Sequence, residues 1–413
     1  MITTNSPHFW RTVAALGLGA FVAYGNLYVT QPLLPLLSGE FGVSALVAGL
    51  SVSLAILALG FSLLLYGPLS DALGRRGIMR LTLGGTVALT LALALAPNFG
   101  ALLLLRLAQG ILIGGLPALA LAYLGEEFAP EALTPALGIY IAATSLSGIS
   151  GRLISGLAAG YGGWRCSFLT TGVVSLLFVL LFFLLLPPSR HFQARDFQWR
   201  SAVAGFAAHL RNPLLVPAFL IGGLNFFLFV GQFNTVVYLL VAPPFRLPPA
   251  LVSLLYLTFL AGTASSVCAD RLIRGRSRTF GLALGFGIVL AGILLTLAPH
   301  LAAVIGGLLL VSFGFFLVHA LATAWVGHHA RTDRASASAL YLIFYYLAGS
   351  LGGLYAAFFW DRFGWGGVVS GAFPILLAVG CCLHCLSRLE KAEAGEVVFP
   401  GWLWLRGSEH PRR

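Results

Sequence analysis

The sequence predicts an all-α membrane protein with twelve transmembrane helices in two pseudo-symmetric six-helix bundles. Three observations predict it: an apolar composition, long apolar runs at regular intervals, and an internal repeat. Of the 413 residues, 59% are hydrophobic and only 9% are charged. The mean hydropathy is +0.94. A water-soluble domain needs more charged residues to cover its surface, so most of this exterior must face lipid.

The apolar runs have the length that a membrane helix needs, which is about 20 residues. Short breaks containing Gly, Pro or Arg separate them, and the 50 glycines suit helices that pack closely within a membrane. The predicted spans are residues 13–37, 45–66, 78–97, 100–123, 135–160, 164–186, 214–239, 249–269, 279–298, 301–326, 336–359 and 366–387.

The net charge of +11 follows the loops rather than forming one basic surface. Nineteen of the 24 basic residues fall on the side that holds both termini, and three fall on the other side, namely Arg165, Arg246 and Arg362. Positive residues mark the cytoplasmic side of a membrane protein, so both termini are expected in the cytoplasm and the protein in the cell inner (plasma) membrane. The same pattern argues against a nucleic-acid partner.

An internal repeat supports the two halves. At a constant offset of 201 residues, Tyr140 matches Tyr341, Gly148 matches Gly349, Gly151 matches Gly352, and Gly163-Trp164 matches Gly364-Trp365. Parallel duplication of six spans is typical of carriers that open one site alternately to each side of the membrane. The expected domains are a first bundle (1–186), a central cytoplasmic linker (187–213), a second bundle (214–387) and a cytoplasmic tail (388–413).

The linker allows two interpretations. Residues 192–210 place Phe192, Trp199, Phe206 and Leu210 on one helical face, as in an amphipathic helix on the membrane surface, although Asp196 interrupts this face. A plain solvated linker is the alternative. In the tail, residues 399–404 contain two tryptophans and predict an anchor at the headgroups.

The segment between the second and third spans carries a distinctive pattern over residues 67–77, Gly-Pro-Leu-Ser-Asp-Ala-Leu-Gly-Arg-Arg-Gly. Gly67 and Gly74 would permit a tight turn. Asp71 can accept hydrogen bonds from a helix N-terminus, and Arg75 and Arg76 can bind carboxylates or lipid phosphates. The alternative is a turn whose arginines only set the topology. A second copy follows the eighth span, with Asp270 and Arg274 at offset 199 from Asp71 and Arg75 and without the glycine positions.

With this pattern the chain resembles the major facilitator superfamily, in its twelve-span branch of drug–proton antiporters and arabinose-efflux-like permeases. The resemblance covers nearly the whole chain. It implies a secondary active transporter that moves a small organic solute by alternating access, with no cofactor. In the family this loop is a conformational latch, whose Asp bridges to the second half in the outward-facing state. The resemblance carries the latch role over to Gly67, Asp71, Gly74, Arg75, Arg76, Asp270 and Arg274.

Two further elements resemble the family. In the fourth span, Arg106-Leu-Ala-Gln109-Gly110 matches an Arg-x-x-Gln-Gly element whose Arg is linked to proton transfer or to anchoring the cavity. An Arg facing lipid costs at least a few kcal/mol, so Arg106 should point into the bundle, in a functional role or in a structural hydrogen-bonding role. In the fifth span, residues 147–156 resemble the antiporter signature Gly-x-x-x-Gly-Pro-x-x-Gly-Gly. Arg152 stands in place of its Pro, which puts antiport in doubt while keeping a face of small residues for close packing.

The acidic residues are absent from the span centres, because all 13 lie at span ends or outside the spans. With Arg106 and Arg152 as the cations within the spans, we expect a cavity that favours anionic or neutral polar solutes. His319 is either a proton carrier or a neutral buried residue satisfied by a neighbour. The remaining cavity candidates, each also explicable as an interhelical hydrogen bond, are Tyr24, Asn26, Tyr28, Gln31, Gln109, Asn225, Gln232, Asn234, Tyr341 and Tyr345.

The leading expectation is proton-coupled efflux of a small organic solute by a monomeric carrier in the lipid bilayer. The alternative is a proton-linked importer or uniporter of an organic anion. A membrane sensor or membrane-embedded enzyme is a distant third, since the sequence has no nucleotide-binding Gly-rich loop and no catalytic cluster. The run Cys381-Cys382-Leu383-His384-Cys385 could hold a metal, but thiols packing in a membrane helix explain it better, so no metal is expected.

Overall fold

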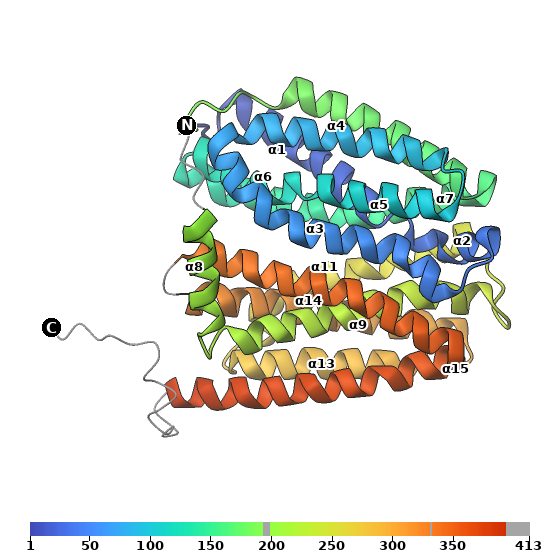
Figure 1. Cartoon of the computed structure of the whole chain (residues 1–413). Coiled ribbons are helices and arrows are strands. Elements are labelled where there is room, and N and C mark those ends of the chain that lie inside the picture. The colour runs from blue at the N-terminus through green and yellow to red at the C-terminus, as the bar shows by residue number, and fades with distance from the viewer. Residues whose placement is uncertain (193–198, 331–332, 394–413) are drawn as a thin grey trace. The chain divides into compact units, whose positions relative to one another are not determined.

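A computed structural model describes residues 1–192, 199–330 and 333–393, and within these ranges the chain is almost entirely helical (Figure 1). Each of the twelve predicted spans overlaps a helical segment, which confirms the all-α membrane fold. The helices of the first half are α1 (Pro7–Ala20), η1 (Phe21–Gly25), η2 (Gln31–Leu33), α2 (Leu34–Phe41), α3 (Ala45–Leu73), α4 (Arg75–Ala94), α5 (Phe99–Ile113), α6 (Gly115–Glu127) and α7 (Pro130–Leu185).

The linker and the second half continue this pattern. Their helices are α8 (Trp199–Leu210), α9 (Val216–Val241), α10 (Pro249–Ser253), η3 (Leu254–Thr258), α11 (Phe259–Val267), α12 (Ala269–Leu272), α13 (Arg278–Leu295), α14 (Leu301–His329) and α15 (Arg334–Glu393). Nine helices of the described chain are long and apolar enough to cross a membrane, and two of these, α7 and α15, are long enough to cross it twice.

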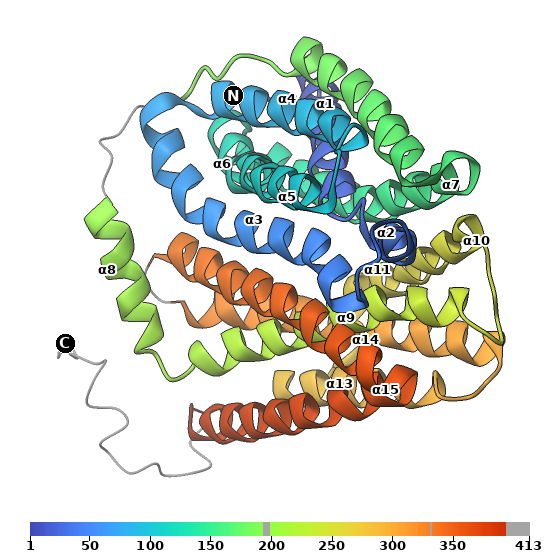
Figure 2. The same cartoon turned by 45° about the vertical axis from the view of Figure 1, so that its right-hand side comes forward.

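The described residues form two compact units. Of the described residues, the first unit contains 1–192, 231–257 and 353–365, and the second contains 199–230, 258–330, 333–352 and 366–393. In the first unit, α3, α4 and α5 pack side by side (Figures 1 and 2). In the second, α13 packs along α14. The domain boundaries expected from the sequence stay a prediction.

The first span is broken in its middle. After α1 the chain passes through the π-helical turn η1 and a non-helical turn at Tyr28–Thr30, then through the 3₁₀ turn η2 into α2. Pro32 and Pro35 explain the break, because each lacks the N–H that a continuous helix would donate to the carbonyl four residues earlier. The break leaves carbonyl groups of this span without their helical donors.

The turn after the second span is tighter than expected. α3 continues through Gly67 to Leu73 and α4 begins at Arg75, so Gly74 alone forms the turn, with φ of +91°. The prediction that Gly67 opens the turn was therefore wrong. Gly275 also has a positive φ, +73°, and lies 201 residues after Gly74. In the register of Asp270 the second copy has Ser266 and Ile273 at the glycine positions, as expected, but Gly275 supplies the positive φ two residues later, at the offset of 201.

The repeat is visible in backbone geometry. Gly163 in α7 and Gly364 in α15 have φ values of +70° and +61°, and at each of them two spans join within one long helix. An L side chain is strained in this conformation, which explains why glycine occupies both positions.

The linker contains the helix α8, which covers the later part of the expected amphipathic segment. Phe192 precedes the helix, and Asp196 lies outside the described residues, as does the expected anchor at 399–404. The choice between a membrane-surface helix and a solvated linker stays open.

Candidate functional site

Arg106, on α5, is completely buried in the first unit and donates to backbone carbonyls. Its Nε donates to the carbonyl of Ser51 at 2.8 Å, and its Nη1 and Nη2 donate to the carbonyls of Asn26 and Leu27 at 2.9 and 2.5 Å. Nη1 also donates to Oε1 of Gln109, one helical turn along α5. Arg106 thus donates to two carbonyls beside the break in the first span and to one in the second span.

Side chains around Arg106 continue this network. Oδ1 of Asn26 accepts from Oγ1 of Thr90 at 2.7 Å, and Nε2 of Gln109 donates to the same Thr90 hydroxyl at 2.7 Å. Nδ2 of Asn26 donates to the Ser175 hydroxyl at 2.9 Å and to the carbonyl of Val22 at 2.7 Å. We call Asn26, Thr90, Arg106 and Gln109 the Arg106 cluster. It ties the first, second, third and fourth spans together.

A second buried cluster surrounds Arg152 on α7, also in the first unit. Its Nε donates to Oε1 of Gln31 at 2.5 Å, and Nε2 of Gln31 donates to Oδ1 of Asn234 at 2.6 Å. The guanidinium carbon lies 3.9 Å from the ring centre of Tyr28 and 5.2 Å from that of Tyr256. We call Tyr28, Gln31, Arg152 and Asn234 the Arg152 cluster. The structure brings together these four predicted residues, from the first, fifth and seventh spans.

Two buried side-chain atoms of α9 lack hydrogen-bond partners within the described chain. Within the described chain, neither Nδ2 of Asn234 nor Oε1 of Gln232 has a hydrogen-bond partner, although the two residues are only 1% and 3% exposed. A buried polar group without a partner costs about 1–3 kcal/mol. This region is therefore one where a polar solute or solvent molecule would be stabilised.

In the second unit, three predicted residues join an aromatic group. Nδ1 of His319 lies 3.0 Å from the Tyr341 hydroxyl, and the His319 ring lies 4.9 Å from that of Tyr345. Tyr345 stacks on Phe226 at 3.8 Å, and Phe315 stacks against His319 at 6.2 Å. This group, from α9, α14 and α15, offers planar apolar faces and one titratable ring.

The other cavity candidates are not members of the two arginine clusters. Asn225 donates to the carbonyl of Phe315 at 2.9 Å and so has an interhelical role. Tyr24 lies in η1 and belongs to neither cluster.

At the loop after α3, the predicted latch residues pair within the first half. Asp71 lies 2.6 Å from Arg75, which is also 2.8 Å from Glu126 at the end of α6. Arg76 donates to the carbonyl of Leu186 at 2.9 Å. In the second copy, neither Asp270 nor Arg274 makes an ion pair with another described residue.

Sequence reasoning missed several members of these networks. Thr90, Ser175 and Tyr256 are ordinary residues within apolar runs, and no local pattern marks them. Glu126 is one of the acidic residues at span ends, and no local pattern links it to Arg75. Its pairing with Arg75 depends on how the ends of α4 and α6 come together, which the one-dimensional sequence does not contain.

Comparison with known proteins assigns the chain to a family. The sequence profile of the Major Facilitator Superfamily matches residues 16–353. The chain is 38% identical to the uncharacterized MFS-type transporter YybF of Bacillus subtilis (strain 168), over 92% of this chain and 94% of that one. It is 36% identical to the inner membrane transport protein YnfM of Escherichia coli (strain K12), over 93% of each chain.

Solved structures agree on the fold. A bacterial homologue of the human lysosomal transporter Spinster, in an inward-facing and occupied conformation, matches with a TM-score of 0.74 at 15% identity, over 94% of this chain and 98% of that one. The twelve helical spans, the repeat and the relatives lead to one conclusion: the chain is a multi-pass membrane transporter, not an enzyme, and it belongs to the major facilitator superfamily.

Proposed function

We propose that this transporter is a secondary active carrier that exports a small organic solute by alternating access, in exchange for protons. The proposal places it in the inner membrane as a monomer, with both termini in the cytoplasm. Its direction and coupling are supported by the resemblance of the loop at Asp71 and of the Arg106 element to the antiporter and sugar-efflux branch.

We propose further that the solute carries a carboxylate or another compact acceptor group. The Arg152 cluster is the observation that carries this step. A guanidinium that is 3% exposed can form charge-assisted hydrogen bonds with an anion, which are about twice as strong as neutral ones. Nδ2 of Asn234, buried and unpartnered within the described chain, adds a donor close to Gln31.

Arg106 supports this assignment by contrast. Its Nε, Nη1 and Nη2 all donate to protein acceptors, three of them backbone carbonyls. Taking an anion there would mean removing donors from the broken first span. Arg152 donates to the carbonyl of Gly148 in its own helix at 2.6 Å and to the side chain of Gln31, so an anion there would not remove these donors from the backbone of another span. We therefore assign Arg106 to positioning the first span and Arg152 to the solute.

A second candidate function, import or uniport of an organic anion, keeps one specific observation in its favour. Arg152 occupies the place of the Pro in the antiporter signature. The two candidates share the solute class and differ in the driving gradient, so solute recognition and direction can be tested separately.

The test of the solute class starts with purified protein in detergent. A thermal-shift screen compares small carboxylic acids with their uncharged amides and with amines of the same size. Each carboxylate that stabilises the wild type is then titrated against Arg152→Gln and Arg152→Lys. We expect Arg152→Gln to weaken binding at least tenfold, since a lost hydrogen bond to a charged group amounts to about 1.5–3 kcal/mol.

Arg165→Gln is the matched control, because Arg165 lies on the same helix, is half exposed and pairs with Glu40 at 3.3 Å. This variant should bind like the wild type. Stabilisation by amines but not by carboxylates, with equal affinity in wild type and Arg152→Gln, would contradict the proposed solute class.

A further inference from the structure

At the predicted outer end of the first unit, the carboxylate of Asp361 caps a helix that is far from it in the sequence. Oδ1 of Asp361, in α15, accepts from the backbone N–H of Ala45 at 3.0 Å, and its Oδ2 accepts from that of Leu46 at 2.9 Å. These are the first two N–H groups of α3, whose N-terminal residues have no acceptors within their own helix. The third, that of Val47, is held by the side chain of Ser44 at 3.3 Å.

The acceptors for the first N–H groups of α3 come from two parts of the chain that are far apart in the sequence. Ser44 supplies the local cap that a helix N-terminus ordinarily has. Asp361 accepts from the other two N–H groups, those of Ala45 and Leu46, although it lies 315 residues after Leu46, in the second half of the sequence. A carboxylate at a helix N-terminus is also favoured by the helix dipole, so the contact combines two hydrogen bonds with a favourable charge interaction.

A second polar contact lies at the same end. The Ser38 hydroxyl, in α2, is 2.8 Å from the hydroxyl of Tyr238, near the end of α9. The Tyr238 ring lies 5.9 Å from that of Trp360, the neighbour of Asp361. Here again a residue of the first half meets a residue of the second half, within the same unit.

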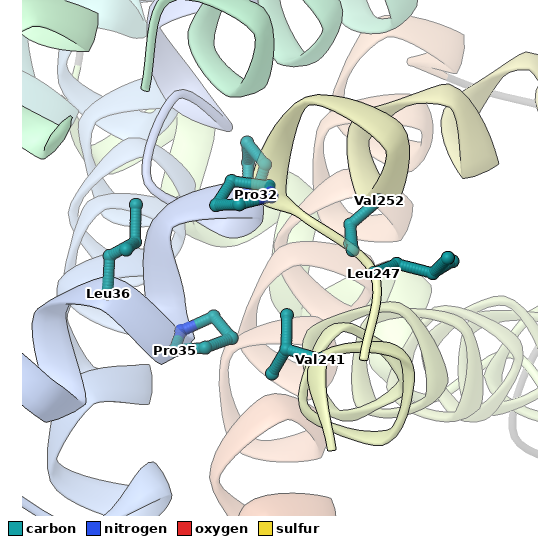
Figure 3. A pocket seen from close by; sticks show the side chains of 7 residues that line it. Pro32, Pro35, Leu36, Val241, Leu247 and Val252 are labelled. Carbon is teal, nitrogen blue, oxygen red and sulfur yellow. The ribbon is translucent and has the colours of Figure 1, made fainter. Parts of the chain in front are cut away.

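Apolar packing around these contacts is incomplete. A cavity of about 260 Å³ separates η2 and α2 from the end of α9 and the start of α10 (Figure 3). Pro32, Pro35 and Leu36 line one side, and Val241, Leu247, Pro249 and Val252 line the other. The atoms around a cavity lose contact partners, so apolar attraction at this end is weakened and the polar contacts carry a larger share of its stability.

We propose that Asp361 is a latch: its bonds to the N-terminus of α3 hold the outer end of the carrier closed, and they break when that end opens. Asp361 is exposed at the edge of this contact. Water can therefore replace the carboxylate at the two N–H groups, and the latch can open without leaving a buried donor unpaired. A static cap, which stays closed throughout the transport cycle, is the competing explanation.

The test uses a cysteine as a reporter of opening. Ser253 on α10 is completely buried against Gly156 of α7, so a cysteine there is protected while this end is closed. The variant Ser253→Cys is made together with Cys166→Ser, which removes the native thiol at the outer end. Labelling by a membrane-impermeant maleimide is then followed in proteoliposomes.

Adding Asp361→Ala should raise the labelling rate about tenfold, which corresponds to about 1.4 kcal/mol. Asp361→Asn should raise it less, because the amide oxygen can still accept one of the two N–H groups. Arg362→Ala, at the next position, is the control and should leave the rate unchanged.

A second variant removes the donor instead of the acceptor. Ala45→Pro deletes the N–H that bonds Oδ1 of Asp361, at the first helical position, where proline is well tolerated. It should also speed labelling. Unchanged labelling in Ala45→Pro, or in an Asp361→Ala protein that unfolds at the wild-type temperature, would overturn the latch, as would an equal increase in Arg362→Ala.

Discussion

At the scale of single residues, the two membrane-embedded arginines differ in what surrounds them. Arg106 is held by backbone carbonyls of two neighbouring spans. Arg152 lies against the side chains of Gln31 and Tyr28, and its Nη1 donates to the carbonyl of Gly148, which is in its own helix, at 2.6 Å. Side chains can change rotamer when a solute binds, whereas backbone acceptors of a packed span cannot move independently. Replacing Arg106 is therefore expected to lower the stability of the protein, whereas replacing Arg152 is expected to weaken solute binding.

Arg106→Ala should lower the stability of the protein before any effect on solute recognition. It would remove the guanidinium from the buried carbonyls of Asn26, Leu27 and Ser51, and each lost hydrogen bond to a charged group amounts to about 1.5–3 kcal/mol. We expect the free energy of unfolding to fall by about 3 kcal/mol or more, measured as a lower thermal unfolding midpoint in detergent. Arg106→Lys should recover only part of it, because an ammonium cannot reproduce the planar fork.

Arg165→Ala provides the comparison, since removing a half-exposed ion pair should change stability by about 1 kcal/mol or less. An Arg106→Ala protein with the unfolding midpoint of the wild type would show that the carbonyl network is not structural.

Individual site residues were predictable to different degrees. The sequence indicated that Arg152, Gln31 and Asn234 belong to one polar site, because polar residues in membrane spans need partners. It left open what each arginine does. The distinction between Arg106 and Arg152 comes from the turn at Tyr28–Thr30, which ends the helix directly after the Asn26 and Leu27 carbonyls that Arg106 binds. It also depends on which residues of other spans face that turn.

At the scale of helices, the repeat appears as a pair of equivalent contacts. A Cβ at Gly151 would lie 2.3 Å from Cα of Gly25 in the first span. A Cβ at Gly352 would lie 2.1 Å from the carbonyl oxygen of Phe227 in the seventh. The expected small-residue face of the fifth span is thus confirmed as a packing surface, and the eleventh span uses the matching position in the same way.

Gly151→Ala and Gly352→Ala should each destabilise the protein by about 1–3 kcal/mol, because a methyl group has no room at either backbone contact. Gly77→Ala, where a Cβ would meet nothing within 4 Å, should be neutral or slightly stabilising. Thermal unfolding of the three variants tests this. A large loss for Gly151→Ala with none for Gly352→Ala would contradict the equivalence of the two contacts.

The elements themselves were largely predictable, since span length and apolar composition are local properties. The exceptions are instructive. Gly67 continues α3 rather than starting a turn, because one residue with positive φ, Gly74, suffices to reverse the chain. Gly275 was overlooked because the second copy was aligned on its charges at offset 199, whereas the backbone repeats at 201.

At the scale of the whole molecule, the open question is which gradient drives transport. Vesicles containing the purified protein, with membrane potential clamped, are given pH gradients of either sign. Export by proton exchange predicts that a carboxylate solute accumulates when the vesicle interior is more acidic. Proton-linked import predicts accumulation when the exterior is more acidic, and uniport predicts neither.

Protein-free vesicles and Arg152→Gln vesicles control for passive permeation of the protonated acid. His319→Gln refines the test, since His319 with its Tyr341 partner is the titratable group of the second unit's aromatic cluster. If His319 carries the proton, this variant should lose gradient-driven accumulation but keep solute exchange. Undiminished gradient-driven accumulation in His319→Gln would assign proton transfer elsewhere.

The Arg106 network also bears on how the chain enters the membrane. Among the described residues, the acceptors of its guanidinium are on Asn26, Leu27, Ser51 and Gln109, and each lies in the span that carries Arg106 or in an earlier one. During synthesis, the spans that receive this charge have therefore already left the ribosome when the fourth span emerges, or emerge with it. An arginine facing lipid is energetically unfavourable in the bilayer. Arg106 can enter the bilayer together with its hydrogen-bond acceptors, which have been synthesised by then, and does not depend on the second half of the chain.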